Sequence, residues 1–186
     1  MPEFLTTERL ILRDLAETDL DDLVALDNDP EVMRYLNGGK PVPREELRDT
    51  ILPKLLRGYQ RYGDRPGYWA AETRAGRQFL GWFALTPTDR PDEAELGYRL
   101  RRSAWGAGYG TEGSKALIRK GFTELGLTRV IAQTMAVNAA SRRVMEKSGL
   151  IYARTFHETW DDPLPGTELG EVEYALDVEE WRRLEA

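Results

Sequence analysis

The stretch ELGYRLRRSAWGAGYGTE, residues 95–112, decides the fold. Its first half alternates apolar and polar residues, which is typical of a strand with one dry and one wet face. Glycines follow at positions 106, 108 and 110, and an apolar helical pattern then runs from Thr111 to Leu125. A glycine loop between a strand and a helix lets the main chain approach a ligand and points the first free N–H groups of the helix at an anion. This order predicts a phosphate-binding turn.

A glycine turn alone is also compatible with a flexible connection or with two better-known phosphate sites. A dinucleotide-binding oxidoreductase requires a continuously apolar first strand and an acidic residue about 20 positions further on. The strand here alternates, and the next predicted strand, Arg129 to Thr134, carries Gln133 in place of an acid. A Walker-type loop would close on a Lys-Ser or Lys-Thr pair, which these glycines lack. Both interpretations are disfavoured.

Three segments in this order resemble the GNAT superfamily of acetyl-CoA-dependent N-acetyltransferases. They are Tyr98-Arg-Leu100, Trp105-Gly-Ala-Gly-Tyr-Gly-Thr-Glu112 and Asn138-Ala-Ala-Ser-Arg-Arg-Val-Met-Glu-Lys-Ser-Gly-Leu150. The resemblance covers nearly the whole chain, and it is greatest to the branch that contains the ribosomal-protein N-terminal acetyltransferases and many homologues acting on other amines. It implies one N-acetyltransferase domain over residues 1–186, with acetyl-CoA as co-substrate and an amine as acceptor.

Composition narrows the classes of function. The chain has 186 residues, a net charge of −6, no cysteine and one histidine, His157. A cysteine nucleophile, a disulfide framework and a histidine or cysteine cluster for a metal are therefore excluded. The negative charge argues against a nucleic-acid partner, although Arg99, Arg101 and Arg102 predict a local basic patch beside the glycine loop. No apolar run has membrane length and no signal-peptide pattern is present, so we expect a cytoplasmic protein without membrane association. The sequence leaves open whether it is a monomer or a homodimer.

The remaining pattern predicts an α/β fold with a single mixed, mostly antiparallel sheet of six to seven strands flanked by helices. Strands are expected at residues 5–14, 68–73, 79–86, 95–101, 129–134, 150–159 and 170–177. Helices are expected at residues 20–26, 30–36, 44–63, 111–125, 138–147 and 178–184, with Pro53 kinking or splitting the third. A helix separates the fourth and fifth strands, so these two are expected to be parallel neighbours. The resemblance implies that this central pair splays apart.

The resemblance also implies which residues bind coenzyme A. Main-chain N–H groups at Gly106, Gly108, Tyr109, Gly110 and Thr111 would hold the diphosphate, with Trp105 packing beneath the loop. The backbone from Tyr98 to Leu100 would bind the pantetheine arm, and an N–H near Gly97 or Tyr98 would reach the thioester oxygen. For Gly97 a β-bulge is an equal alternative. Asn138 would cap its helix and also reach the arm, whereas Glu112 is expected only to complement the helix dipole.

Two residues are candidates for catalysis. Many relatives place a tyrosine where Met145 stands, as proton donor to the departing thiolate, and Ser141 is the substitute implied here; a serine that only packs against the cofactor is the alternative. Glu95 is the leading candidate for the base because it begins the splayed strand, and His157, Glu158 and Asp161 compete with it. An α-amino group, with a pKa of about 8, needs less help from a base than a lysine at about 10. The sequence thus predicts direct acetyl transfer to a protein N-terminus or a small amine, with a non-catalytic acyl-CoA sensor as the alternative.

Overall fold

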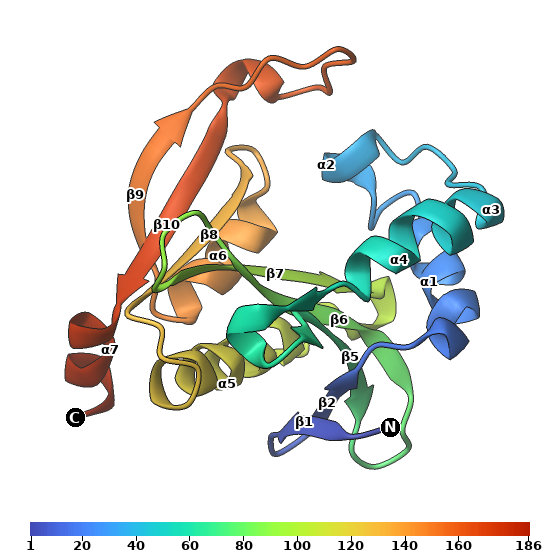
Figure 1. Cartoon of the computed structure of the whole chain (residues 1–186). Helices are drawn as coiled ribbons and strands as arrows, with labels where there is room; N and C mark the ends of the chain where they lie inside the picture. The colour runs from blue at the N-terminus through green and yellow to red at the C-terminus, as the bar shows by residue number, and fades with distance from the viewer.

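An eight-stranded sheet forms the centre of the molecule, in the strand order β1-β2-β5-β6-β7-β8-β10-β9 (Figure 1). The computed structural model describes residues 1–186. The strands are β1 (Glu3–Thr6), β2 (Leu10–Asp14), β5 (Tyr68–Thr73), β6 (Phe79–Pro87), β7 (Glu93–Leu100), β8 (Arg129–Met135), β9 (Ile151–Phe156) and β10 (Glu171–Asp177). A separate hairpin pairs β3 (Gly58–Tyr59) with β4 (Arg65–Pro66). The predicted mixed, mostly antiparallel sheet is confirmed.

The sheet has one strand more than the upper limit of the prediction, because residues 5–14 form a hairpin rather than one strand. Its turn is closed by the N–H of Thr7, which donates to the carbonyl of Leu10 at 2.9 Å, and by the N–H of Leu10, which donates to the Thr7 hydroxyl at 2.9 Å. A threonine hydroxyl that bonds the nearby backbone favours a turn over a continuous strand.

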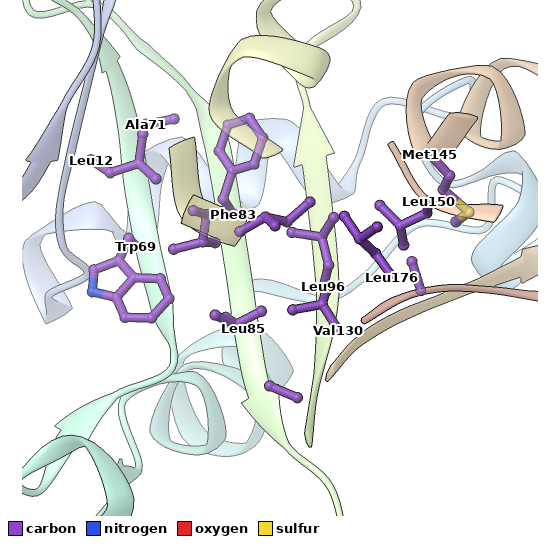
Figure 2. Close-up of a cluster of buried hydrophobic side chains, with 14 of the residues drawn as sticks. Leu12, Trp69, Ala71, Phe83, Leu85, Leu96, Val130, Met145, Leu150 and Leu176 are labelled. Atoms are coloured by element: carbon purple, nitrogen blue, oxygen red, sulfur yellow. The ribbon is translucent and has the colours of Figure 1, made fainter. Parts of the chain in front are cut away.

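Helices cover both faces of the sheet. They are α1 (Leu20–Asp27), α2 (Arg34–Asn37), α3 (Arg44–Glu46), α4 (Leu52–Leu55), α5 (Tyr109–Thr123), α6 (Ala139–Lys147) and α7 (Val178–Glu185). One core joins α5 and α6 to the sheet and includes Phe83, Leu96, Val130 and Met145 (Figure 2). A smaller core lies on the opposite face under α1 and α4, around Leu23 and Leu52, and Figure 1 shows α1 to α4 gathered there. None of the helices combines the length and apolar composition needed to cross a bilayer.

The predicted third helix, residues 44–63, is shorter than expected and ends at Leu55. It contains a wide π-type turn over Leu47–Ile51, directly before Pro53. Proline has no N–H to donate to the preceding turn, so a widened turn there satisfies the backbone better than a regular helix. The second helix also differs: it begins at Arg34 and not at residue 30, and its Leu36 is 49% exposed.

The central pair of strands, β7 and β8, is parallel for only three residue pairs, which end at Glu95 and Ile131. Beyond that point β7 stays paired with β6 as far as Leu100, and β8 stays paired with β10 as far as Met135. The facing edges of β7 and β8 therefore have no partner strand. The predicted splay is confirmed, and it leaves a gap whose backbone groups are free to bind an extended ligand.

Candidate active site

The glycine turn lies at the N-terminus of α5, which begins at Tyr109, two residues earlier than predicted. Gly106 and Gly108 have φ of 72° and 83°, left-handed values that glycine adopts at little cost. The first hydrogen bond of the helix is donated by the N–H of Glu112 to the carbonyl of Gly108, at 3.0 Å. The N–H groups of residues 106 to 111 donate to no protein acceptor. This row of free donors at a helix N-terminus fits the diphosphate of coenzyme A.

The turn is clamped by the β1–β2 hairpin, which the sequence did not reveal. Arg9 donates to the carbonyl of Ala107 at 2.7 Å and to a carboxylate oxygen of Glu112 at 2.6 Å. Thr7 donates to the other carboxylate oxygen of Glu112, also at 2.6 Å. Burial acts to raise the pKa of Glu112, but the hydrogen bonds from Thr7 and Arg9 outweigh burial and hold that pKa below its usual value. Glu112 thus does more than complement the helix dipole, and Arg9 brings a positive charge to the turn.

The basic patch expected beside the turn is neutralised. Its three arginines each form an ion pair with an acid of α1 or of the loop after it: Arg99 with Asp27, Arg101 with Asp22, and Arg102 with Asp29. These pairs hold α1 against β7. Trp105 also differs from the expectation, because its indole is 48% exposed and donates to the carbonyl of Leu100 at 2.9 Å instead of packing beneath the loop.

The residues of β7 that border the gap alternate between the two faces of the sheet. Leu96 and Leu100 are buried in the core under α5, and Tyr98 packs against that core. Gly97 faces the other side, where an added Cβ would lie 3.7 Å from the Trp82 ring. The register between β6 and β7 runs unbroken through Gly97, so the β-bulge alternative is wrong. A role for its N–H at the thioester stays a prediction.

The second motif forms α6, whose start is fixed by Asn138. The side chain of Asn138 accepts from the N–H of Ser141 at 3.3 Å, which confirms the cap, and donates to the hydroxyl of Thr134 at 3.1 Å. The hydroxyl of Ser141 lies 2.9 Å from the hydroxyl of Tyr98. Met145 is buried in the core and offers no proton. The structure therefore places Ser141 beside a second hydroxyl, which sequence spacing did not reveal.

Glu95 lies on the opposite face from α5, at the last paired position before the gap. It is the third residue of β7 and not, as expected, the first. Burial raises the pKa of Glu95, and the nearby carboxylates of Glu173 and Glu158 raise it further. Glu95 is half-buried and forms no ion pair, whereas the competing candidates in the β9–β10 connection, His157, Glu158 and Asp161, are all exposed.

A hollow of about 420 Å³ opens beside Glu95 on this face, and most of its lining is charged or polar. Glu173, in its wall, accepts from Arg154 at 3.0 Å and from Gln133 at 2.7 Å. Glu171 lies on the same side of β10 as Glu173, and one of its carboxylate oxygens is buried without a partner. Burial and the charge of Glu158 raise the pKa of Glu171. Two carboxylates on this face, those of Glu95 and Glu171, thus have no paired cation.

The sequence of the chain matches the family model of the acetyltransferase (GNAT) domain over residues 9–151. The chain belongs to the GNAT acetyltransferases. A relative from Aspergillus fumigatus, FsC-acetyl coenzyme A-N(2)-transacetylase, is 37% identical over 97% of this chain and 79% of that relative's length.

Solved GNAT structures share the fold. A ribosomal L7/L12 α-N-protein acetyltransferase in complex with coenzyme A superposes with a TM-score of 0.77 at 17% identity, covering 96% of this chain and 99% of the other. Spermidine N-acetyltransferase from Vibrio cholerae, in complex with CoA and spermine, gives 0.75 at 16% identity, covering 95% and 99%. Identities this low show the fold alone. Family membership together with the free N–H row identifies the protein as an acetyl-CoA-dependent N-acetyltransferase of the GNAT type.

Proposed function

We propose that the protein transfers the acetyl group of acetyl-CoA directly to a primary amine, either the α-amino group of a protein N-terminus or an amine of a small molecule. The observation that carries the proposal is the gap between β7 and β8. It has unpaired N–H groups at its open end and the unpaired carboxylate of Glu95 at its closed end. Acetyl-CoA and the amine can therefore reach the gap from opposite faces of the sheet.

On the donor side, the N–H groups from Gly106 to Thr111 would hold the diphosphate. The free edge from Tyr98 to Leu100 would bind the pantetheine arm by its backbone, with Asn138 near the end of the facing strand. An N–H at Gly97 or Tyr98 would donate to the thioester oxygen, whose charge grows as the amine attacks. Donors fixed in place before the reaction lower that barrier without reorganisation.

On the acceptor side, Glu95 is the base of the proposal. Its raised pKa makes its carboxylate a stronger base than an exposed one. The ammonium loses a proton to Glu95, directly or through a water, and the nitrogen then bonds to the acetyl carbon. The nitrogen releases its second proton to solvent as the amide forms. The C–S bond breaks with its electron pair on sulfur. The hydroxyl of Ser141 relays a proton from solvent to sulfur, so the thiolate becomes the thiol and the serine stays neutral. An α-amino group or a less basic amine requires the least from such a base.

The unpaired carboxylates on the acceptor side favour a positively charged acceptor amine. Glu95 and Glu171 face the acceptor side without paired cations, so a positively charged amine would be attracted there. The name of the Aspergillus fumigatus relative supports acetyl transfer to an N(2) nitrogen of FsC, whereas the resemblance to the ribosomal-protein branch supports a protein N-terminus.

The test is release of free thiol from acetyl-CoA in the presence of FsC, spermidine or a peptide with a free α-amino group. At least one acceptor should release thiol in proportion to acetylated product, and the same peptide with an acetylated N-terminus should release none. Binding of coenzyme A with no thiol release from any acceptor would favour the acyl-CoA sensor hypothesis over this proposal.

A further inference from the structure

The Tyr98 phenol reaches from β7 to α6, and both of its hydrogen bonds go to one residue. Its hydroxyl lies 3.0 Å from the carbonyl oxygen of Ser141 and 2.9 Å from the hydroxyl of Ser141. The two residues are 43 positions apart in the sequence. Tyr98 belongs to β7, which borders the gap, and Ser141 to α6, the helix that follows β8. A phenol is therefore held against the serine proposed above as the proton donor.

The hydrogens of this pair allow two arrangements. Each hydroxyl has one hydrogen to donate. If the phenol donates to the carbonyl of Ser141, the serine hydroxyl is free to donate back to the phenol oxygen. If the phenol donates to the serine hydroxyl, the serine hydrogen must turn to another acceptor. Both hydrogen bonds form at once in the first arrangement, because a carbonyl oxygen only accepts. The second arrangement gives up the bond to the carbonyl and leaves the serine hydrogen to point toward a ligand in the gap.

Tyr98 is suited to orient a proton and not to give one up. Burial raises the pKa of Tyr98 to about 12, so the phenol stays protonated in neutral solution. Its ring packs against Phe83 with centroids 6.2 Å apart, which fixes the position of the hydroxyl. A phenylalanine would fill the same space, so packing alone does not require the hydroxyl.

We propose that Tyr98 is a positioning residue, whose hydroxyl turns the hydrogen of Ser141 toward the departing sulfur when acetyl-CoA occupies the gap. This inference rests on the role proposed above for Ser141. When the C–S bond breaks, its electron pair stays on sulfur, which takes the serine proton while the serine oxygen takes a proton from solvent. Tyr98 keeps its own proton throughout, and donation from the phenol polarises the serine O–H bond as successive hydrogen bonds in a chain do.

The test compares Tyr98→Phe, Ser141→Ala and the double variant, with acetyl-CoA and whichever of FsC, spermidine or the α-amino peptide reacts fastest. For Tyr98→Phe we expect kcat to fall about tenfold, the effect of one lost hydrogen bond, with the KM for acetyl-CoA unchanged. For Ser141→Ala we expect a fall of about 100-fold. The double variant should be no slower than Ser141→Ala within about twofold, because the phenol acts through the serine.

Tyr152→Phe is the matched control, because its hydroxyl also pairs with a neighbouring hydroxyl, that of Thr155 at 2.7 Å, on an exposed strand away from the gap. It should leave kcat unchanged. The inference is overturned if Tyr98→Phe keeps the wild-type kcat while Ser141→Ala is slow, if its only effect is a raised KM, or if the two single losses multiply in the double variant. Ser141→Ala at the wild-type rate would instead refute the serine's role in the proposed function, and this inference with it.

Discussion

Arg9 and Glu112 form an ion pair of 2.6 Å between the β1–β2 turn and the first turn of α5, although 103 residues separate them in the sequence. Arg9 also bonds the carbonyl of Ala107 within the glycine turn. The N-terminal hairpin therefore acts as a clamp on the site expected to hold the diphosphate. The guanidinium of Arg9 adds a positive charge next to the glycine turn. Arg99, Arg101 and Arg102 do not supply one, because each forms an ion pair with an aspartate.

Replacement of this arginine, Arg9→Met, should weaken coenzyme A binding about three- to tenfold, because the turn loses both its clamp and a positive charge near the phosphates. Isothermal titration calorimetry at two salt concentrations measures the affinity for coenzyme A, which should depend less on salt in the variant than in the wild type. Arg74→Met is the control, since Arg74 bonds the same hairpin at the carbonyl of Thr7 without touching the glycine turn. Equal affinities of Arg9→Met and wild type would contradict the clamp.

The charge of Glu112 should make stability depend on pH at the acid end. The pKa of this carboxyl is held below its usual value of 4.5 in the folded protein, so its bonds stabilise the fold above about pH 4.5 and lose that effect as pH falls through the lowered pKa. The difference in unfolding free energy between wild type and Glu112→Gln should thus be present at pH 7 and shrink below pH 4.5. Chemical denaturation at a series of pH values measures it. A difference in unfolding free energy that does not change with pH would show that the charge of Glu112 does not contribute to stability.

Substitution in the glycine turn should abolish coenzyme A binding. Gly108 has a φ of 83°, and a Cβ there would lie 3.2 Å from the guanidinium of Arg9. In Gly108→Val the side chain disfavours this conformation and covers the free N–H groups. Gly126→Val is a matched control, because Gly126 also has a positive φ, 71°, and has no atom near its Cβ position. Both variants should lose similar stability, but only Gly108→Val should lose binding; binding retained by Gly108→Val would place the diphosphate elsewhere.

Local patterns in the sequence predicted the glycine turn, the alternating strand β7 and the cap of α6. Each depends on residues close together in the chain, such as Asn138 and Ser141. The contacts that complete the site are not local. Nothing in the spacing of Arg9 and Glu112, or of Tyr98 and Ser141, indicates that they meet, because their distance is set by how strands and helices stack.

Chain geometry at single residues explains most of the remaining differences. Thr7 turns the expected first strand into a hairpin. Pro53 follows a widened helical turn and not a simple kink. Gly97 suggested a bulge, yet its strand is regular. A glycine or proline signals that the backbone is unusual, but the neighbouring elements decide which unusual conformation it adopts.

Contact between α5 and the sheet should be sensitive to a single methyl group. A Cβ at Gly113 would lie 2.3 Å from the Phe83 ring, which is fully buried. Gly113→Ala should therefore destabilise the protein by about 1–3 kcal/mol despite the better helix propensity of alanine. Thermal unfolding measures the loss. Lys115→Ala, at an exposed position of the same helix, should be nearly neutral, and equal stability of the two variants would show that the helix shifts without cost.

The pH dependence of kcat/KM should show whether Glu95 is the base. It can be tested by a substitution at Glu158, a neighbouring residue that need not touch the substrate. Glu158 is exposed, and its negative charge contributes to the raised pKa of Glu95. In Glu158→Gln that repulsion is absent, so the pKa of Glu95 falls and the acidic limb of kcat/KM should move to lower pH. Glu95→Gln should abolish the limb and reduce kcat/KM about 100-fold or more. Glu180→Gln, on the distant α7, should leave the profile in place. An acidic limb that stays where it is in Glu158→Gln and persists in Glu95→Gln would assign the proton to another group.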